Sequence, residues 1–325
     1  MIIIKAENLI KEYKYFEKPE GLKASVKSLF KRETKLRRAL DDFAFSVDEG
    51  EFVGLMGPNG AGKTTLIKLL TGIIRPSSGE ISVLGYEPAR GDAAFKKKFA
   101  VVMGQKSQLW WDLPASDSLL LNKAIYEIPE RQYRDNVAYF TKLFEVERYL
   151  NVPVRKLSLG ERMKFELIAS LLHAPKLLFL DEPTIGLDAM AQRQIRAMLK
   201  AAGRERGVTL LLTSHYTEDL LELTPRCVVI RGGKKIYDGE INTLLQQYSV
   251  NHTITVKFAT ETKLPELYGA EIIEQTPFSV EIRTPKENVR NCLSKLMELV
   301  DIEDIQIADD DVTLLVERVF KTHEN

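Results

Sequence analysis

Hydrophobic residues in the first two thirds of the chain follow two patterns that alternate along the sequence. Short runs that are almost continuously apolar, as in buried strands, occur at residues 2–10, 43–56, 99–104, 177–180 and 208–213. Apolar residues at helical spacing lie between several of these runs. The region from about 116 to 173 is expected to be largely helical, with breaks at Pro129 and Pro153. This alternation predicts an α/β fold with a mostly parallel sheet covered on both faces.

The pattern changes near Gly239. Two half-buried strands, a helix, a further strand and a closing helix are expected, in this order, at residues 253–258, 278–283, 286–299, 302–307 and 312–320. We therefore predict a large domain over residues 1–240 and a small accessory α+β domain over residues 241–325.

Composition narrows the class of protein. The chain has 325 residues, of which 44% are apolar and 28% charged, as expected for a globular protein with a real core. Two cysteines exclude a disulfide scaffold and a cysteine-rich zinc site. No apolar run approaches the roughly 18 to 20 residues of a membrane helix, and the start lacks the features of a signal peptide. A soluble, cytosolic protein is expected.

Charge is balanced overall but unevenly placed. The 46 Lys and Arg equal the 46 Asp and Glu, so global binding to nucleic acid is not expected. Residues 14–38 carry a net charge of +6, and residues 301–325 carry −6. This asymmetry favours either partners at the two ends or two solvated faces. Helical spacing of apolar residues in 22–38 predicts an amphipathic basic helix there.

The sharpest motif is Gly57-Pro58-Asn59-Gly60-Ala61-Gly62-Lys63-Thr64-Thr65. It fits G-x-x-x-x-G-K-[ST] and lies between an expected strand and an expected helix, which is the context that a phosphate-binding loop requires. Glycines let successive backbone N–H groups turn toward one anion, and the helix N-terminus adds free donors. Lys63 is expected at the β- and γ-phosphates, the Thr64 hydroxyl at Mg²⁺ and Thr65 near the α-phosphate. The alternative is a glycine-rich turn before an ordinary helix.

Two further motifs follow. The apolar run 177–180 ends in Asp181-Glu182, where Asp181 could face the metal and Glu182 could orient or activate water; the alternative is a strand that ends at solvated acids. Upstream, Ser158 and Glu161 form an S-x-x-E capping box before a helix. That motif is either a structural cap or, with the N–H of Gly160, a second anion site.

Together these segments resemble the ATP-binding subunit of an ABC transporter, over roughly residues 1–240. The resemblance rests on the order of the phosphate loop, a glutamine loop at Gln105, a signature at 157–161, Asp181-Glu182, the loop Gly186-Leu187-Asp188, and His215. It implies a P-loop NTPase fold with a parallel core, an antiparallel β subdomain, a helical signature subdomain at about 106–173 and a basic insertion at about 16–38.

The resemblance also implies a mechanism. Two subunits, expected as a homodimer, pair head to tail and enclose two ATP molecules, each facing Ser158 and Gly160 of the other subunit. Tyr13 matches the aromatic residue that stacks on adenine, with Tyr15 as a competitor and ordinary strand packing as the alternative. Further matches are Gln105 near Mg²⁺, Asp188 at the dimer interface and His215 at the γ-phosphate. The signature departs from Leu-Ser-Gly-Gly-Gln at Leu159 and Glu161, and Leu159 would hinder close backbone approach if glycine were required there.

The resemblance implies coupling to a membrane partner. Trp110 and Trp111 follow Gln105 and suit a partner groove, although a Trp pair buried in the helical subdomain is an alternative. We expect the basic insertion to touch anionic headgroups or an acidic permease surface, against a solvated intramolecular helix. The chain is expected at the cytoplasmic face of the membrane, as a peripheral ATPase powering export through a separate permease. Alternatives are a soluble ABC ATPase acting on ribosomes or nucleic acid, and a regulatory module without hydrolysis.

Overall fold

The computed structural model describes residues 1–16, 34–104, 106–214, 216–249, 251–262 and 269–309. The chain divides into two compact units, Met1–Gly239 and Glu240–Asn325, and each is described by itself. Among the described residues, no helix combines the length and apolar character needed to cross a membrane.

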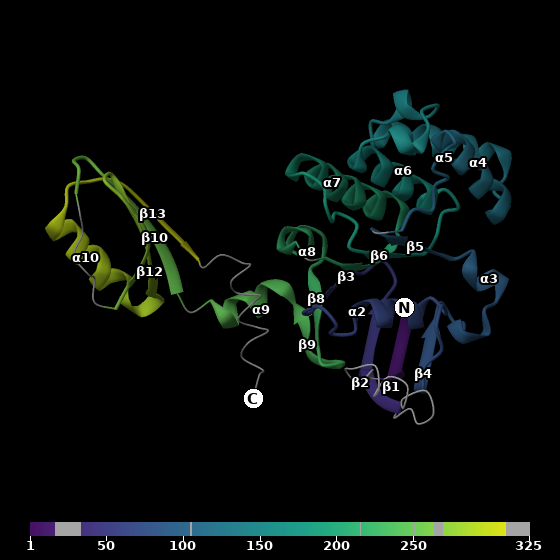
Figure 1. The fold of residues 1–325 in the computed structure, drawn as a ribbon, viewed down its shortest axis with the longest axis horizontal. Coiled ribbons are helices and arrows are strands. Elements are labelled where there is room, and N and C mark those ends of the chain that lie inside the picture. The colour runs from purple at the N-terminus through teal and green to yellow at the C-terminus, as the bar shows by residue number, and fades with distance from the viewer. Residues whose placement is uncertain (17–33, 105, 215, 250, 263–268, 310–325) are drawn as a thin grey trace, which may run out of the picture. The chain divides into compact units, whose positions relative to one another are not determined.

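A six-stranded sheet forms the centre of the first unit (Figure 1). Its strands, in spatial order, are β5 (Phe99–Met103), β6 (Leu177–Asp181), β7 (Thr209–Thr213), β3 (Phe52–Met56), β8 (Arg226–Arg231) and β9 (Lys234–Glu240). The pairs β5–β6, β6–β7, β7–β3 and β3–β8 are all parallel. The predicted parallel sheet is confirmed, and its adjacent β3, β6 and β7 carry their carboxyl ends to one edge.

A second sheet is antiparallel and has the order β2-β1-β4. It consists of β1 (Ile2–Phe16), β2 (Thr34–Asp48) and β4 (Ser78–Val83). The single strand predicted at 43–56 is wrong, because this stretch belongs to two strands in two different sheets. The break is a turn at Glu49 and Gly50, and Gly50 has a φ of +78°, a conformation that favours glycine.

The basic helix predicted over 22–38 is wrong for residues 34–38, which belong to β2. There the backbone pairs with β1, so that Arg38 lies opposite Glu12 and Arg37 opposite Tyr13. Arg38 forms ion pairs with Glu12 at 2.9 Å and Asp41 at 2.8 Å. Ladder hydrogen bonds along β1 outweigh a helical spacing that Leu36 alone supports in this segment. Residues 17–33, with the rest of the predicted helix, lie outside the described residues.

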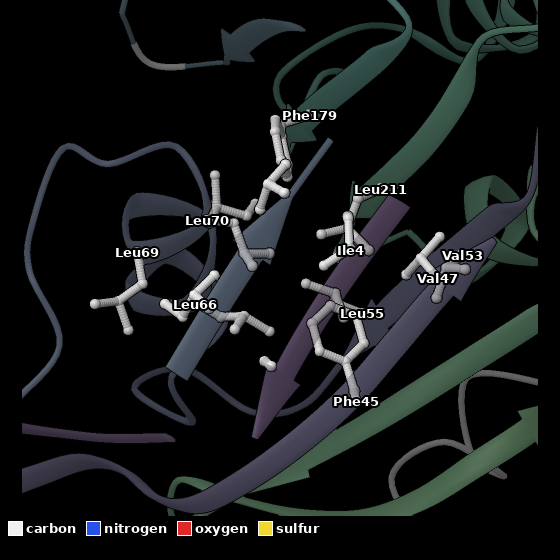
Figure 2. Close-up of a cluster of buried hydrophobic side chains, with 14 of the residues drawn as sticks. Ile4, Phe45, Val47, Val53, Leu55, Leu66, Leu69, Leu70, Phe179 and Leu211 are labelled. Carbon is white, nitrogen blue, oxygen red and sulfur yellow. The ribbon is translucent and has the colours of Figure 1, made fainter. Parts of the chain in front are cut away.

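Helix α2 (Lys63–Leu70) packs between the two sheets, and its buried side chains join both into one core (Figure 2). Val53 and Leu55 of β3 belong to this core. The alternate residues of β3 face the other way. Phe52 lies against Gly203 of α7 (Ala189–Arg206), and Gly54 lies against Leu220 of α8 (Thr217–Leu223). The two-residue period of the strand therefore explains why helices cover both faces of the sheet.

The helical region contains α4 (Ala115–Tyr126), α5 (Glu130–Leu143) and α6 (Leu159–Leu171), joined by the short turns η2 (Glu147–Tyr149) and η3 (Val154–Lys156). Pro129 directly precedes α5 and Pro153 directly precedes η3, which are the positions where proline is tolerated. Smaller elements of this unit are η1 (Pro88–Arg90) and α3 (Ala93–Lys96).

The second unit begins with α9 (Ile241–Tyr248). Its antiparallel sheet has the order β11-β12-β10-β13 and contains β10 (Asn251–Phe258), β11 (Glu271–Thr276), β12 (Ser279–Pro285) and β13 (Ile302–Asp309). Following the short η4 (Lys286–Asn288), α10 (Val289–Leu299) buries Cys292 and Leu296 in one core with β10 and β12. The predicted helix 312–320 lies outside the described residues.

Candidate nucleotide-binding site

The phosphate loop lines a pocket of about 380 Å³ at the carboxyl end of β3. The pocket is lined by Asn59, Gly60, Ala61, Gly62, Lys63, Thr64 and Thr65 of the loop, and by Tyr13, Arg37, Ala39 and Glu182 from elsewhere in the chain. Strand, loop and α2 thus follow in the order that the motif predicted. This volume lies within the range of small-molecule binding sites.

Two glycines of the loop have conformations and surroundings that admit no side chain. Gly57 has a φ of +153°, and a Cβ there would lie 2.3 Å from the carbonyl oxygen of Ile230. Gly62 has a φ of +118°, and a Cβ there would lie 2.5 Å from the carbonyl oxygen of Ala39. Gly62 is also the N-cap of α2 and supplies no side-chain acceptor to the first turn. The donors at this helix end therefore stay available to an anion.

Lys63 is a buried cation within the loop. Its ammonium donates hydrogen bonds to the carbonyl oxygens of Gly57 at 2.6 Å and Pro58 at 3.2 Å. Burial lowers the pKa of Lys63, and the nearby charges of Glu182 and Asp181 act in the opposite direction. The loop thus holds one positive charge in a place where water stabilises it poorly, which favours an incoming phosphate.

Asp181 lies at the end of β6, beside both the phosphate loop and β7. The hydroxyl of Thr213 donates to Asp181 Oδ1 at 2.6 Å, and the hydroxyl of Thr64 lies 3.4 Å from the same oxygen. Hard oxygen donors of this kind suit Mg²⁺, which keeps several waters and takes few protein ligands. Thr64 and Asp181 therefore fit a magnesium site completed by phosphate oxygens and water.

Glu182 follows directly and has a strained backbone. Its φ is +57°, in the left-handed region that a glutamate adopts at a cost of about 1–3 kcal/mol. Its N–H donates to the carbonyl oxygen of Thr213 at 3.0 Å, and its side chain lines the phosphate-loop pocket. The register of β6 and β7, in which Asp181 pairs with Thr213, holds both acids at the pocket edge.

A buried ionic cluster supports the two loops that flank these acids. Asp219, fully buried in α8, accepts hydrogen bonds from the hydroxyl of Thr184 and from the hydroxyl of Ser214 at 2.6 Å. Arg196 of α7, also buried, donates to Asp219 at 2.9 Å. The cluster fixes Thr184, two residues after Glu182, and Ser214, directly before His215. One carboxylate thus ties together the segments after β6 and β7.

The signature forms a second pocket, of about 330 Å³, that shares no lining residue with the first. It is lined by Ser158, Leu159, Gly160 and Glu161 together with Gly186, Leu187 and Asp188. The predicted capping box is present: Ser158 Oγ accepts from the N–H of Glu161 at 3.3 Å, and Glu161 accepts from the N–H of Ser158 at 2.9 Å. Asp188 caps α7 in the same way by accepting from the N–H of Ala191 at 2.8 Å.

The departure at Leu159 has a simple explanation. Leu159 is the first residue of α6 and follows the extended N-cap Ser158, so its backbone is helical and does not need glycine. Burial opposes ionisation of Glu161, but hydrogen bonds from Tyr149 and Ser158 lower the pKa of its carboxyl. The acid is therefore engaged with Tyr149 and Ser158 of its own subunit.

The structure brings Tyr13, Glu182 and most residues of the phosphate loop to one pocket, together with Arg37 and Ala39, which the sequence did not indicate. Arg37 belongs to the segment for which a basic helix is predicted, and Thr213, which donates to Asp181, is the last residue of a predicted strand. Arg37 depends on the β1–β2 register, but Thr213 could have been found as a polar residue ending an apolar strand. Gln105 and His215 lie outside the described residues.

Trp110 and Trp111 are 56% and 51% exposed, so neither forms the buried pair of the alternative interpretation. The tryptophans thus belong to the surface of this unit rather than to its core.

Known proteins resemble this chain over the same region. The family model described as ABC transporter matches residues 40–185. The ABC transporter ATP-binding protein NatA of Bacillus subtilis (strain 168) is 30% identical over 217 residues, which is 67% of this chain and 88% of that protein. The Nod factor export ATP-binding protein I of Neorhizobium galegae is 34% identical over 65% of this chain, and the match spans 60% of that relative's length. A solved structure described as the ATP-binding subunit of an ABC transporter is 27% identical, with a TM-score of 0.61, and the match covers 76% of this chain and 93% of that one. The chain therefore belongs to the ABC transporter family and is one of its ATP-binding, ATP-hydrolysing subunits.

Proposed function

We propose that this subunit powers export through a separate membrane permease, and that it does so as a head-to-tail dimer with ATP bound at the interface. The observation that carries the proposal is the division of the site. The phosphate loop and Glu182 line one pocket, whereas Ser158, Gly160 and Asp188 line another. A head-to-tail arrangement of two subunits brings each half against the complementary half of its partner, a symmetric and closed assembly.

Within one subunit, the phosphate loop binds the ATP phosphates through backbone N–H groups and Lys63. Tyr13 offers its ring to the adenine. Arg37, opposite Tyr13 on the neighbouring strand, reaches the loop, because its Nη2 lies 3.3 Å from where a Cβ of Gly60 would be. We infer that Arg37 adds a second positive charge to the nucleotide site.

Hydrolysis follows from the carboxylates. Thr64 and Asp181 would hold Mg²⁺, with Gln105 nearby, and the metal would neutralise charge on the phosphates when bound. Glu182 would orient or deprotonate the attacking water, and His215 would contact the γ-phosphate. The hydrogen bond from Thr213 to Asp181 keeps that carboxylate turned toward Thr64. Ser158 and the N–H of Gly160 would face the same γ-phosphate from the partner subunit.

Export and the membrane partner rest on the relatives and on one surface. A relative is named for Nod factor export, and several apolar side chains of α4 and the preceding loop are exposed, namely Trp110, Trp111, Leu113, Leu120 and Ile125. This surface would receive the permease at the cytoplasmic face of the membrane. Lipid contact through the basic insertion stays a prediction for residues 17–33. A soluble role on ribosomes or nucleic acid is not favoured.

Glu182→Gln tests the catalytic assignment. We expect this variant to bind ATP, to hydrolyse it about 10²- to 10⁴-fold more slowly, the range typical of a lost general base, and to elute as a dimer with ATP and Mg²⁺. Glu222→Gln, outside both pockets, is the matched control. It should hydrolyse ATP at the normal rate and should not accumulate as a stable dimer. Normal turnover by Glu182→Gln would contradict the role of Glu182.

A monomer in the presence of ATP would contradict the dimer. Affinity capture from membranes separates the partner classes, because a multispan permease supports transport and ribosomal proteins support the alternative.

A further inference from the structure

A buried carboxylate outside the nucleotide site joins the signature helix to the loop that follows Gln105. Glu166 lies in α6 and is only 3% exposed. One of its oxygens accepts from the hydroxyl of Ser107 at 2.6 Å, and the two oxygens lie 3.1 and 3.0 Å from the N–H of Gln108. No sequence motif includes Glu166, which lies between the buried Phe165 and Leu167 of the helix.

Such a carboxylate is held in place by its hydrogen bonds. Burial raises the pKa of Glu166, while Ser107, the backbone N–H groups of Gln108 and Leu109, and the charge of Arg162 oppose that effect. Because Glu166 is almost fully buried, its carboxylate oxygens depend on these donors in place of water, and leaving them without partners would be unfavourable. Separating Ser107 and Gln108 from Glu166 would therefore be energetically unfavourable, and we expect the loop and the helix to move together.

The same loop is attached to its surroundings on both sides. Toward the central sheet, Gln108 Nε2 donates to the carbonyl oxygen of Val101 in β5 at 2.9 Å. Toward the helical region, the N–H of Trp110 donates to Ser118 of α4 at 3.0 Å, and the guanidinium of Arg162 lies 5.5 Å from the Trp111 ring centre. On the helical side, the partners Glu166 and Ser118 are both buried, so these contacts are shielded from water.

We propose that Glu166 is a positioning residue that fastens residues 107–111 to α6. A displacement of the signature end of α6 would then also move the exposed Trp110 and Trp111. This inference rests on the proposed function, in which Ser158 meets the partner's ATP. Glu166 lies eight residues after Ser158, about 12 Å along a helix that rises about 1.5 Å per residue. Because α6 is continuous over Leu159–Leu171, a displacement of its N-terminal end also moves Glu166. The hydrogen bonds of Glu166 to Ser107 and Gln108 then move the loop with the helix.

Intrinsic fluorescence can test the proposal directly, because the two tryptophans of the chain, Trp110 and Trp111, both lie in this loop. The parent is the full chain with Glu182→Gln, which traps the ATP state. In this background Glu166→Gln keeps the volume but places an amide NH₂ against two donors, and Ser107→Ala removes one donor. Asp135→Asn, an exposed carboxylate of α5, is the matched control.

We expect ATP with Mg²⁺ to change tryptophan emission in the parent and in the control. Glu166→Gln should reduce this change by at least half, and Ser107→Ala by less. A fluorescent ATP analogue should bind all four proteins with affinities within about threefold of each other, because none of the substitutions alters a contact to the nucleotide. A residue that only supports folding is not expected to reduce the tryptophan response to ATP while leaving the affinity for ATP unchanged.

Unchanged emission responses in both Glu166→Gln and Ser107→Ala, with ATP binding and dimer formation intact, would overturn the inference alone. An absent response in a parent that binds ATP and dimerises would overturn it as well. A parent that fails to bind ATP or to dimerise would instead overturn the proposed function. If Glu166→Gln fails to fold, as seen from its circular dichroism, Ser107→Ala decides the outcome.

Discussion

Replacing the buried Arg196 by methionine should destabilise the ATP-binding unit far more than the loss of a surface ion pair would. Arg196 donates to the fully buried Asp219 at 2.9 Å, and it also pairs with the half-exposed Glu222 at 3.0 Å. Removing one partner of a buried ion pair costs about 3–5 kcal/mol, because the remaining charge is left without compensation. Asp219 keeps the hydroxyls of Thr184 and Ser214, so we expect the lower end, about 3 kcal/mol.

The contact with Glu222 provides the control. Glu222 is 44% exposed, and a glutamine there can still accept from Arg196, so Glu222→Gln should cost about 1 kcal/mol or less although it removes the charge from this pair. For a unit of this size, a loss of about 3 kcal/mol lowers Tm by about 6–12 °C. Thermal melts followed by circular dichroism measure the difference, and the transition of the ATP-binding unit is the one that ATP raises.

Arg196→Met should also lower kcat more than it raises KM for ATP. Asp219 holds Thr184 and Ser214, which flank Glu182 and His215, whereas the phosphate loop has its own support in β3 and α2. A melting temperature within about 2 °C of that of Glu222→Gln would refute the reasoning, because the fully buried pair with Asp219 would then contribute no more than the contact with the half-exposed Glu222.

Three further changes test the nucleotide pocket. Arg37→Ala should weaken ATP binding about tenfold, equal to about 1.4 kcal/mol for one lost charged contact, whereas Lys35→Ala on the same strand should not; titration with a fluorescent ATP analogue measures both. Gly62→Ala should abolish ATP binding measured the same way, because a Cβ there would lie 2.5 Å from the carbonyl oxygen of Ala39, and binding equal to wild type would contradict the loop geometry. Leu159→Gly should lower the free energy of unfolding by about 0.5–1 kcal/mol and leave KM for ATP unchanged, since Leu159 is already helical; a clear gain in ATPase activity would show that glycine is needed there.

Motifs of neighbouring residues predicted much of the candidate site from the sequence. The phosphate loop, Asp181-Glu182 and the capping box at Ser158 and Glu161 each depend on residues close together in the chain. Their backbone geometry follows from glycines, a helix start and an apolar strand, all of which act over a few residues. The same holds for the strands of the parallel sheet, whose continuous apolar runs require burial on both faces.

Long-range pairing decided the rest. Residues 34–38 carried a helical spacing, yet they extend along β1, because the edge of that strand satisfies their backbone hydrogen bonds. Arg37 reached the pocket only through its register with Tyr13. Glu166 pairs with Ser107 and Asp219 pairs with Arg196, and both partners lie more than 20 residues away along the chain, where no periodicity identifies them.

By itself, then, the amino-acid order determined which short segments bind phosphate, present carboxylates or cap a helix, because those properties arise from neighbouring residues. Only the tertiary structure decided which pocket each segment joins, and it separated the phosphate loop from the signature within one chain. It also decided which buried charges hold the loops in place. The physical reason is that a buried carboxylate or a strand edge is stabilised by whatever partner the whole fold brings to it, at any distance along the chain.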